Sequence, residues 1–177
     1  PVVEKIVVVK RTGEKIPMQK GRDFYLSDLL ETADSIVEAE PMESNHPLYI
    51  LYTSGTTGKP KGVVHGTGGY LVYNHSAYKW VFDIKEESVY WCTADVGWVA
   101  GHSSIVYAPL SHGAAIVLYD GAPDCPTVDR WWGSGETYGV SIFDSSPPAI
   151  RTCLCRGQVV VTKRDYSRHA VQVTADA

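Results

Sequence analysis

The sequence predicts an α/β domain with a mostly parallel sheet and flanking helices. Strand-like runs rich in valine, isoleucine and tyrosine alternate along the chain with segments of helical character, which is the order of parallel β–α–β units. The composition of the 177 residues, 44% hydrophobic and 20% charged, leaves room for a sizeable globular core. In this class a ligand lies beside the carboxyl ends of the strands.

Residues 1–46 are expected to form an N-terminal strand, helix and connector. Residues 2–10 are rich in valine and predict a strand. Asp23 is a suitable N-cap for a short helix that ends near Ala33. The acidic stretch 38–46 then leads into the main part of the chain.

Residues 47–157 are expected to hold the main α/β core. Their patterns predict strands at 48–53, 63–65, 88–93, 114–119 and 140–143, and helices at 67–82, 103–110, 129–138 and 147–154. Glycines weaken the third of these helices, and a pair of prolines favours the start of the fourth. The helix at 67–82 carries aromatic side chains that are expected to pack it onto the sheet, at Tyr70, Tyr73, Tyr78 and Trp80.

A glycine-rich run between the first two of these strands is the most informative stretch of the chain. It reads Tyr52, Thr53, Ser54, Gly55, Thr56, Thr57, Gly58, Lys59, Pro60, Lys61 and Gly62. Glycines let backbone N–H groups turn toward an anion, hydroxyls add donors, and lysines supply positive charge. This combination favours a polyphosphate ligand.

The run is not a Walker A loop, because that motif needs glycine, lysine and serine or threonine leading straight into a helix. Here Pro60 follows Lys59 and disfavours helical geometry there. A flexible loop between two strands is the better interpretation. The alternative is a surface hairpin that is rich in glycine, threonine and lysine for other reasons.

The run 52–62 resembles the phosphate-binding signature of the acyl-adenylating, AMP-binding enzymes, which include acyl-CoA synthetases and luciferases. The block 90–103, from Tyr90 to Ser103, resembles the acetyl-CoA synthetase branch in particular. The surroundings at 47–51, 65–70 and 81–83 agree with it. The resemblance covers residues 1–157 and implies a partial large N-terminal domain of such an enzyme.

The resemblance implies ATP, Mg²⁺ and CoA as cofactors and a short-chain carboxylate as substrate. The enzyme joins the carboxylate to the α-phosphate of ATP, releases diphosphate, and passes the acyl group to CoA. The β- and γ-phosphates would be held by Ser54, Gly55, Thr56, Thr57, Gly58, Lys59 and Lys61. No residue of the chain is assigned a catalytic or metal-binding role.

The acyl group would lie beside Trp98, Val99, Ala100 and Gly101. The acetyl-CoA synthetase branch has threonine where this chain has Ala100. The change removes a hydroxyl and enlarges the space slightly, so strict preference for acetate over propionate is in doubt. One methylene in an apolar pocket is worth only about 1–3 kcal/mol. The alternative role for Trp98 is that of a core aromatic.

Neighbouring polar residues admit two interpretations each. His102 could be a general base, but the attacking carboxylate is already ionised, so a structural or pocket-wall role is favoured. Asp95 could bind magnesium or cap a turn. His65, His75 and His112 have no metal-ligand spacing.

Several parts of an acetyl-CoA synthetase are not found in this sequence. They are the downstream adenine segment, the residues that hold the ribose, the small C-terminal domain with the adenylation lysine, and the upstream CoA-contacting arginines. We therefore expect the chain to be inactive alone. Residues 158–177 form a divergent tail, in which 168–177 match no family pattern, and we expect this tail to be poorly packed.

Three functional hypotheses remain open. The first is a fragment of acetyl-CoA synthetase. The second is a stand-alone nucleotide- or phosphate-binding module, or a scaffold that complements the remainder of the enzyme as a separate polypeptide. The third is a piece of a propionyl- or other short-chain acyl-CoA synthetase.

Composition and charge argue against a nucleic-acid-binding or membrane-spanning protein. A net charge of −4 and a pI near 5.8 do not suit a nucleic-acid surface. Neither an apolar run long enough to span a bilayer nor a signal peptide is visible. The four cysteines are expected to be buried reduced thiols of a cytoplasmic protein. Cys153 and Cys155 could instead suggest metal or redox chemistry.

Overall fold

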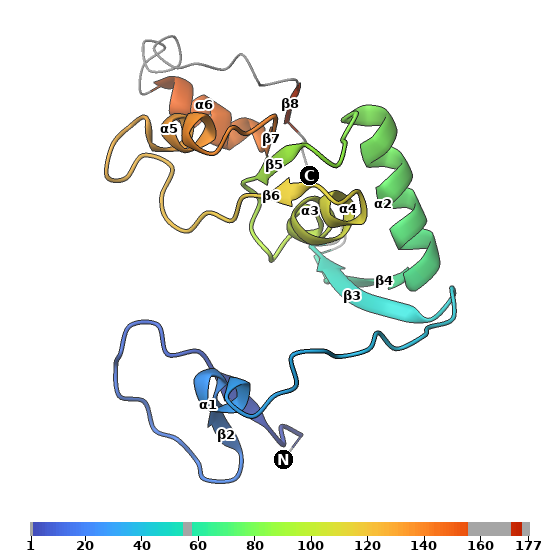
Figure 1. Cartoon of the computed structure of the whole chain (residues 1–177), viewed down its shortest axis with the longest axis vertical. Helices are drawn as coiled ribbons and strands as arrows, with labels where there is room; N and C mark the ends of the chain where they lie inside the picture. The colour runs from blue at the N-terminus through green and yellow to red at the C-terminus, as the bar shows by residue number, and fades with distance from the viewer. Residues whose placement is uncertain (1, 55–57, 156–170, 175–177) are drawn as a thin grey trace. The chain divides into compact units, whose positions relative to one another are not determined.

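The computed structural model describes residues 2–54, 58–155 and 171–174 (Figure 1). The chain divides into two compact units, residues 1–41 and residues 42–177. The smaller unit holds two parallel strands and one short helix, which are β1 (Ile6–Val8), β2 (Asp23–Tyr25) and α1 (Leu26–Leu30). The first strand is therefore shorter than the predicted 2–10.

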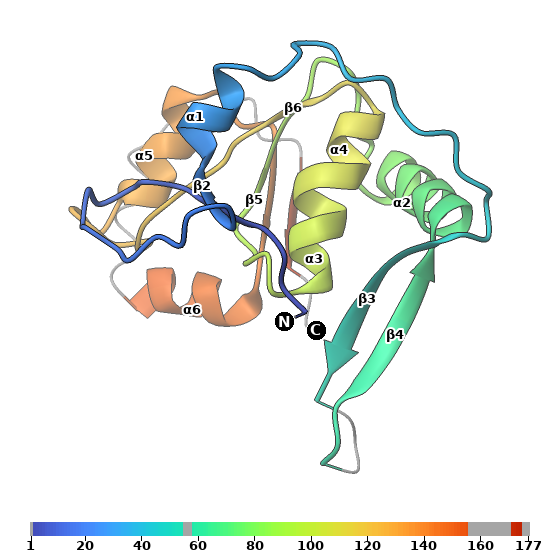
Figure 2. The same ribbon diagram turned by 90° about the horizontal axis from the view of Figure 1, so that it is seen from below.

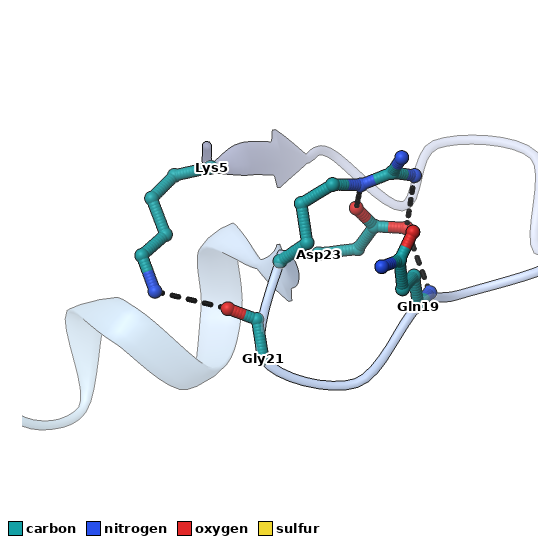
Figure 3. A network of polar contacts seen from close by, with 5 residues as sticks. Lys5, Gln19, Gly21 and Asp23 are labelled. Atoms are coloured by element: carbon teal, nitrogen blue, oxygen red, sulfur yellow. Dashed lines mark hydrogen bonds and ion pairs between the residues drawn. The ribbon is translucent and has the colours of Figure 1, made fainter. Parts of the chain in front are cut away.

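Asp23 is not a helix cap, which corrects the sequence prediction. It lies in β2, and its carboxylate accepts hydrogen bonds from the Arg22 guanidinium and from the Gln19 amide at 2.8 Å (Figure 3). The hydrogen bond from Arg22 lowers the pKa of Asp23. Lys5 Nζ donates to the Gly21 carbonyl at 2.9 Å and ties β1 to the same turn. The Asp23 carboxylate is engaged by Arg22 and Gln19 and does not cap the helix. Helix α1 begins at Leu26 and ends at Leu30.

The larger unit is built on a four-stranded sheet whose strands are all parallel. In spatial order these are β6 (Ala115–Ile116), β5 (Val89–Cys92), β7 (Ile142–Ser145) and β8 (Val171–Thr174). The predicted α/β class with a mostly parallel sheet is confirmed. β6 is shorter than predicted.

Helices cover both faces of this sheet (Figures 1 and 2). On one side lie α5 (Arg130–Thr137) and α6 (Pro147–Cys155). On the other lie α2 (Thr67–Val81) and a continuous helical segment, residues 99–111, which comprises α3 (Val99–His102), the π-helical turn Ser103–Tyr107 and α4 (Ala108–Ser111). The last segment begins four residues before the predicted start at 103.

The two faces form separate hydrophobic cores because side chains alternate along a strand. Tyr90 and Cys92 of β5 pack with Tyr78 of α2 and with Ala108 of α4. Trp91, between them, packs on the opposite side with the cluster of α5 and α6. A strand buried on both faces is typical of parallel sheets.

Of the four aromatic side chains predicted to pack α2 onto the sheet, two are buried: Tyr78 packs with Tyr90 of β5, whereas the Tyr70 ring contacts the rings of Tyr49 and Tyr107. Tyr70 and Tyr78 are each 8% exposed, whereas Tyr73 is 71% and Trp80 is 78% exposed. The prediction is thus wrong for Tyr73 and Trp80. They are seven residues apart and share one flank of the helix, while the buried stripe at Tyr70, Asn74 and Tyr78 lies on another.

β3 (Pro47–Thr53) and β4 (Lys61–Gly66) pair in antiparallel register as the two strands of a hairpin. The two strands expected to flank the glycine-rich run are confirmed. Two backbone hydrogen bonds to the segment before β3 hold the connection from β4 to α2. The Thr67 amide donates to the His46 carbonyl at 2.9 Å, and the Gly68 amide donates to the Ser44 carbonyl at 2.8 Å. These contacts satisfy N–H groups at the start of α2 that have no partner within the helix.

The C-terminal prediction is wrong in part. Val171–Thr174 pair with all four residues of β7 in parallel register, so this stretch joins the sheet. Its sequence alternates valine with polar residues, which suits a strand at a sheet edge. Residues 156–170 and 175–177 of the expected tail lie outside the described residues.

All four cysteines are free thiols, but only Cys92 is buried, and Cys125 and Cys155 are exposed. The expectation of buried thiols is therefore wrong for these two. Burial raises the pKa of the Cys92 thiol to about 12. Within the described ranges, every helix is too short or too polar to cross a bilayer.

The buried Cys92 predicts a loss of stability at alkaline pH. The unfolded thiol ionises near pH 9, while the folded thiol stays protonated to about pH 12. The folded state thus binds more protons in this window, and the free energy of unfolding falls as pH rises, by up to about 1.4 kcal/mol per pH unit. Urea unfolding at about pH 8 and about pH 11 should show a shallower fall in Cys92→Ala. An equal fall in both proteins would contradict this assignment.

Candidate functional site

The end of the β3–β4 hairpin carries the described part of the predicted phosphate loop. Thr53 and Lys61 form the last pair of the hairpin, and Ser54, Lys59 and Lys61 are all exposed. In Figure 2 this end of the hairpin extends away from α2 and from the four-stranded sheet. A hydroxyl and two ammonium groups are therefore presented to solvent from one hairpin end.

Gly58 adopts a left-handed backbone conformation, with φ of 77°, which favours glycine over any residue with a Cβ. Open space surrounds the position that a Cβ would take there, so the backbone conformation and not crowding explains this glycine. Gly55, Thr56 and Thr57 of the predicted loop lie outside the described residues.

The predicted acyl-binding residues lie at a turn that leads into the helical segment 99–111. Asp95 shapes this turn, because its carboxylate accepts a hydrogen bond from the Gly97 amide at 2.7 Å and its carbonyl accepts one from the Trp98 amide at 3.1 Å. The turn-cap interpretation of Asp95 is thereby confirmed. In the described part of the chain, no three His, Cys, Asp or Glu side chains gather as metal ligands.

The four predicted acyl-binding residues differ in exposure. Trp98 is 61% and Val99 is 37% exposed, while Ala100 is half-buried and Gly101 is buried. The exposure of Trp98 is incompatible with its alternative role as a core aromatic. Val99, Ala100 and Gly101 lie in the first helical turn, whereas Trp98 precedes it.

Gly101 has a steric role that sequence reasoning missed. A Cβ at this position would lie 2.2 Å from the Asp95 carbonyl oxygen and 2.8 Å from Val96 Cα. Only glycine therefore lets the helix pack against the turn that holds Trp98. No sequence pattern indicated this role, because the helix was predicted to begin only at residue 103, whereas the structure begins it at Val99.

A cluster of aromatic rings joins the hairpin to this helical segment. It consists of Tyr49, His65, Tyr70, His102 and Tyr107, and we call it the ring cluster. His102 stacks on Tyr49 with a centroid separation of 5.4 Å, which is the contact of a structural residue. Desolvation raises the pKa of the Tyr49 hydroxyl above its ordinary value.

Sequence reasoning missed Tyr49 and His65 as members of this cluster. A signal was available, because Tyr49 lies four residues before Thr53 and His65 lies four residues after Lys61. In an antiparallel hairpin that pairs Thr53 with Lys61, these two residues must face each other, as they do. Their rings stack with centroids 4.7 Å apart.

The fold and these motifs define the class of protein. Residues 2–175 match the family model described as AMP-binding enzyme, and the chain belongs to that family. The match extends over most of the segment 168–177, in which we expected no family pattern.

Within this family the chain is similar to acetyl-coenzyme A synthetases. It is 51% identical to the one from Rubrobacter xylanophilus over 167 residues, which are 94% of this chain and 26% of that relative. Identity to the Pyrobaculum arsenaticum protein of the same name is 51% over 94% of this chain and 25% of the relative. For the Methanothrix thermoacetophila protein it is 50% over 99% of this chain and 26% of the relative. The chain thus spans about a quarter of the length of these relatives.

The tight approach at Gly101 predicts a large cost for adding one methyl group. In Gly101→Ala the new Cβ must displace the turn at Asp95, and overpacking of this kind costs about 1–3 kcal/mol. Gly69→Ala is the matched control, because it also lies in a helix but has open space around it; there alanine should stabilise by up to about 1 kcal/mol. Urea unfolding of both variants measures the difference. Equal stability of the two variants would contradict the steric role.

Proposed function

We propose that the chain is the phosphate- and carboxylate-binding part of an acetyl-CoA synthetase. That enzyme converts ATP, acetate and CoA into acetyl-CoA, AMP and diphosphate through an acetyl-adenylate. The observation that carries the proposal is an exposed hairpin end bearing Ser54, Lys59 and Lys61, in a chain about half identical to acetyl-coenzyme A synthetases.

The hairpin would hold the β- and γ-phosphates of ATP. Its hydroxyls and amides donate hydrogen bonds, and its two lysines offset charge as the carboxylate and the α-phosphate approach each other. These donors fit a triphosphate. Mg²⁺ would arrive with the nucleotide, because it is usually held through substrate phosphates and few protein ligands.

Trp98, Val99 and Ala100 would lie beside the acyl group of the substrate. Trp98 is 61% exposed, which supports contact between its side chain and a small apolar group. The carboxylate attacks in its ionised form, so this chain need not supply a base. CoA, which takes the acyl group in the second step, would be bound in the complete enzyme outside the residues assigned here.

We propose further that the chain acts within a longer polypeptide or with the remainder of the enzyme, in the cytoplasm, and is inactive alone. The length of the relatives and the free thiols support this. A stand-alone nucleotide-binding module is the competing hypothesis. ATP binding by the isolated chain tighter than about millimolar would favour that module.

Ala100 favours a second candidate, a broader short-chain acyl-CoA synthetase. The test uses a chimera in which this chain replaces the matching segment of the Rubrobacter xylanophilus relative. The chimera should form acetyl-CoA, AMP and diphosphate. Ala100→Thr adds a hydroxyl and volume to the pocket and should lower the propionate-to-acetate ratio of kcat/KM by about tenfold.

Two outcomes would count against these assignments. An unchanged ratio would remove Ala100 from the acyl pocket. A folded chimera that neither consumes ATP with acetate nor forms acetyl-CoA would contradict the proposed function itself.

A further inference from the structure

We propose that His102 is a positioning residue, which through the ring cluster sets the spacing between the phosphate-binding hairpin and the acyl-binding motif. The inference rests on the proposed function, because it assigns the two ligands to these two elements. In an adenylating reaction the carboxylate must reach the α-phosphate in line with the leaving diphosphate, so this spacing affects the rate.

Tyr49 is the point at which the two elements meet. It belongs to β3, five residues before Ser54, and pairs with His65 of β4. The rings of His65 and His102 stack on it at 4.7 and 5.4 Å, with interplanar angles of 29° and 24°. One ring of the hairpin thus contacts a residue of α3 directly.

His102 cannot move without moving the acyl-binding motif. It directly follows Gly101, where an added Cβ would lie 2.2 Å from the Asp95 carbonyl oxygen, so no side chain fits between the helix and the turn. The turn, Trp98 and α3 therefore behave as one body, and His102 is the member of that body that reaches the hairpin.

Helix α2 supports the contact from a third direction. Tyr70 packs edge-on against Tyr49 at 5.2 Å and against Tyr107 at 5.4 Å. Its hydroxyl also shares a hydrogen bond of 2.6 Å with Ser103, the residue after His102. Tyr70 is buried, so this contact is fixed to the core of the domain.

The role proposed for His102 is that of a flat ring. Stacking needs a planar side chain, whereas proton transfer needs the imidazole nitrogens. His102→Phe keeps the ring and removes the nitrogens, and His102→Leu keeps apolar volume and removes the flat ring. Comparing these two variants separates positioning from acid–base chemistry.

The variants are made in the chimera with the Rubrobacter xylanophilus relative. Acetate-dependent exchange of diphosphate into ATP reports the adenylation step. We expect His102→Leu to lower kcat by about 10- to 100-fold, since misplacement of one reactant by about 1 Å has that effect. KM for ATP should stay within about twofold, and His102→Phe should retain kcat within about threefold.

His112→Ala is the matched control. His112 also stacks on another histidine, His75, with centroids 4.0 Å apart. Among the described ring contacts, neither of these two rings contacts a member of the ring cluster. We expect this variant to retain the kcat of the unsubstituted chimera. Amide hydrogen exchange adds a readout that does not depend on activity: in His102→Leu, exchange should rise in both β3–β4 and α3, and in His102→Phe it should not.

Normal kcat together with unchanged hydrogen exchange in His102→Leu would overturn the inference. So would a loss of kcat in His102→Phe equal to that in His102→Leu, because the nitrogens and not the ring would then matter. An unsubstituted chimera without activity would contradict the proposed function instead, and the hydrogen-exchange comparison would still decide the role of His102.

Discussion

The burial of β5 and β7 between two layers of helices is the constraint on which the rest of the larger unit depends. Trp91 and Tyr90 are 0% and 1% exposed and project to opposite faces of the sheet. Across the sheet, the Tyr90 hydroxyl donates to the Asp144 carboxylate at 2.8 Å, so the one polar group of this ring is satisfied where water is excluded. α2 and α4 are placed by this core, and α2 in turn holds the ring cluster.

The hairpin depends on that placement. A two-stranded hairpin is marginally stable by itself, and β3 and β4 pair with each other outside the four-stranded sheet. The contacts of Tyr49 and His65 with Tyr70 and His102 therefore anchor its base. Its other end, with Ser54 and the two lysines, is exposed, as the proposed phosphate-binding role requires. The two strands are thus anchored by ring contacts at one end of the hairpin and exposed to solvent at the other.

Sequence patterns predicted the fold class and most elements of the larger unit, because periodicity and turn residues report local structure directly. They failed where a side chain has competing partners. Asp23 suits a helix cap, but the adjacent Arg22 engages its carboxylate. Tyr73 and Trp80 look like core residues, but helix geometry turns them away from the buried stripe.

The candidate site was predictable in part for a similar reason. The loop and the Trp98 block are contiguous in sequence, so their residue types could be recognised together. The ring cluster draws on β3, β4, α2 and the segment 99–111, and tertiary packing alone brings these together. The role of Gly101 likewise depends on a backbone six residues away, which no local pattern specifies.

The central claim is that the hairpin holds the terminal phosphates of ATP. It is tested most directly by calorimetric titration of the chimera and its Lys59→Ala variant with ATP and with AMP, both with Mg²⁺. Lys59→Ala removes a charge-assisted contact and should weaken ATP binding by about tenfold or more, while AMP binding stays unchanged. The control variant Lys79→Ala, on the exposed side of α2, should alter the binding of neither nucleotide. Equal weakening of ATP and AMP, or unchanged ATP binding, would contradict the account.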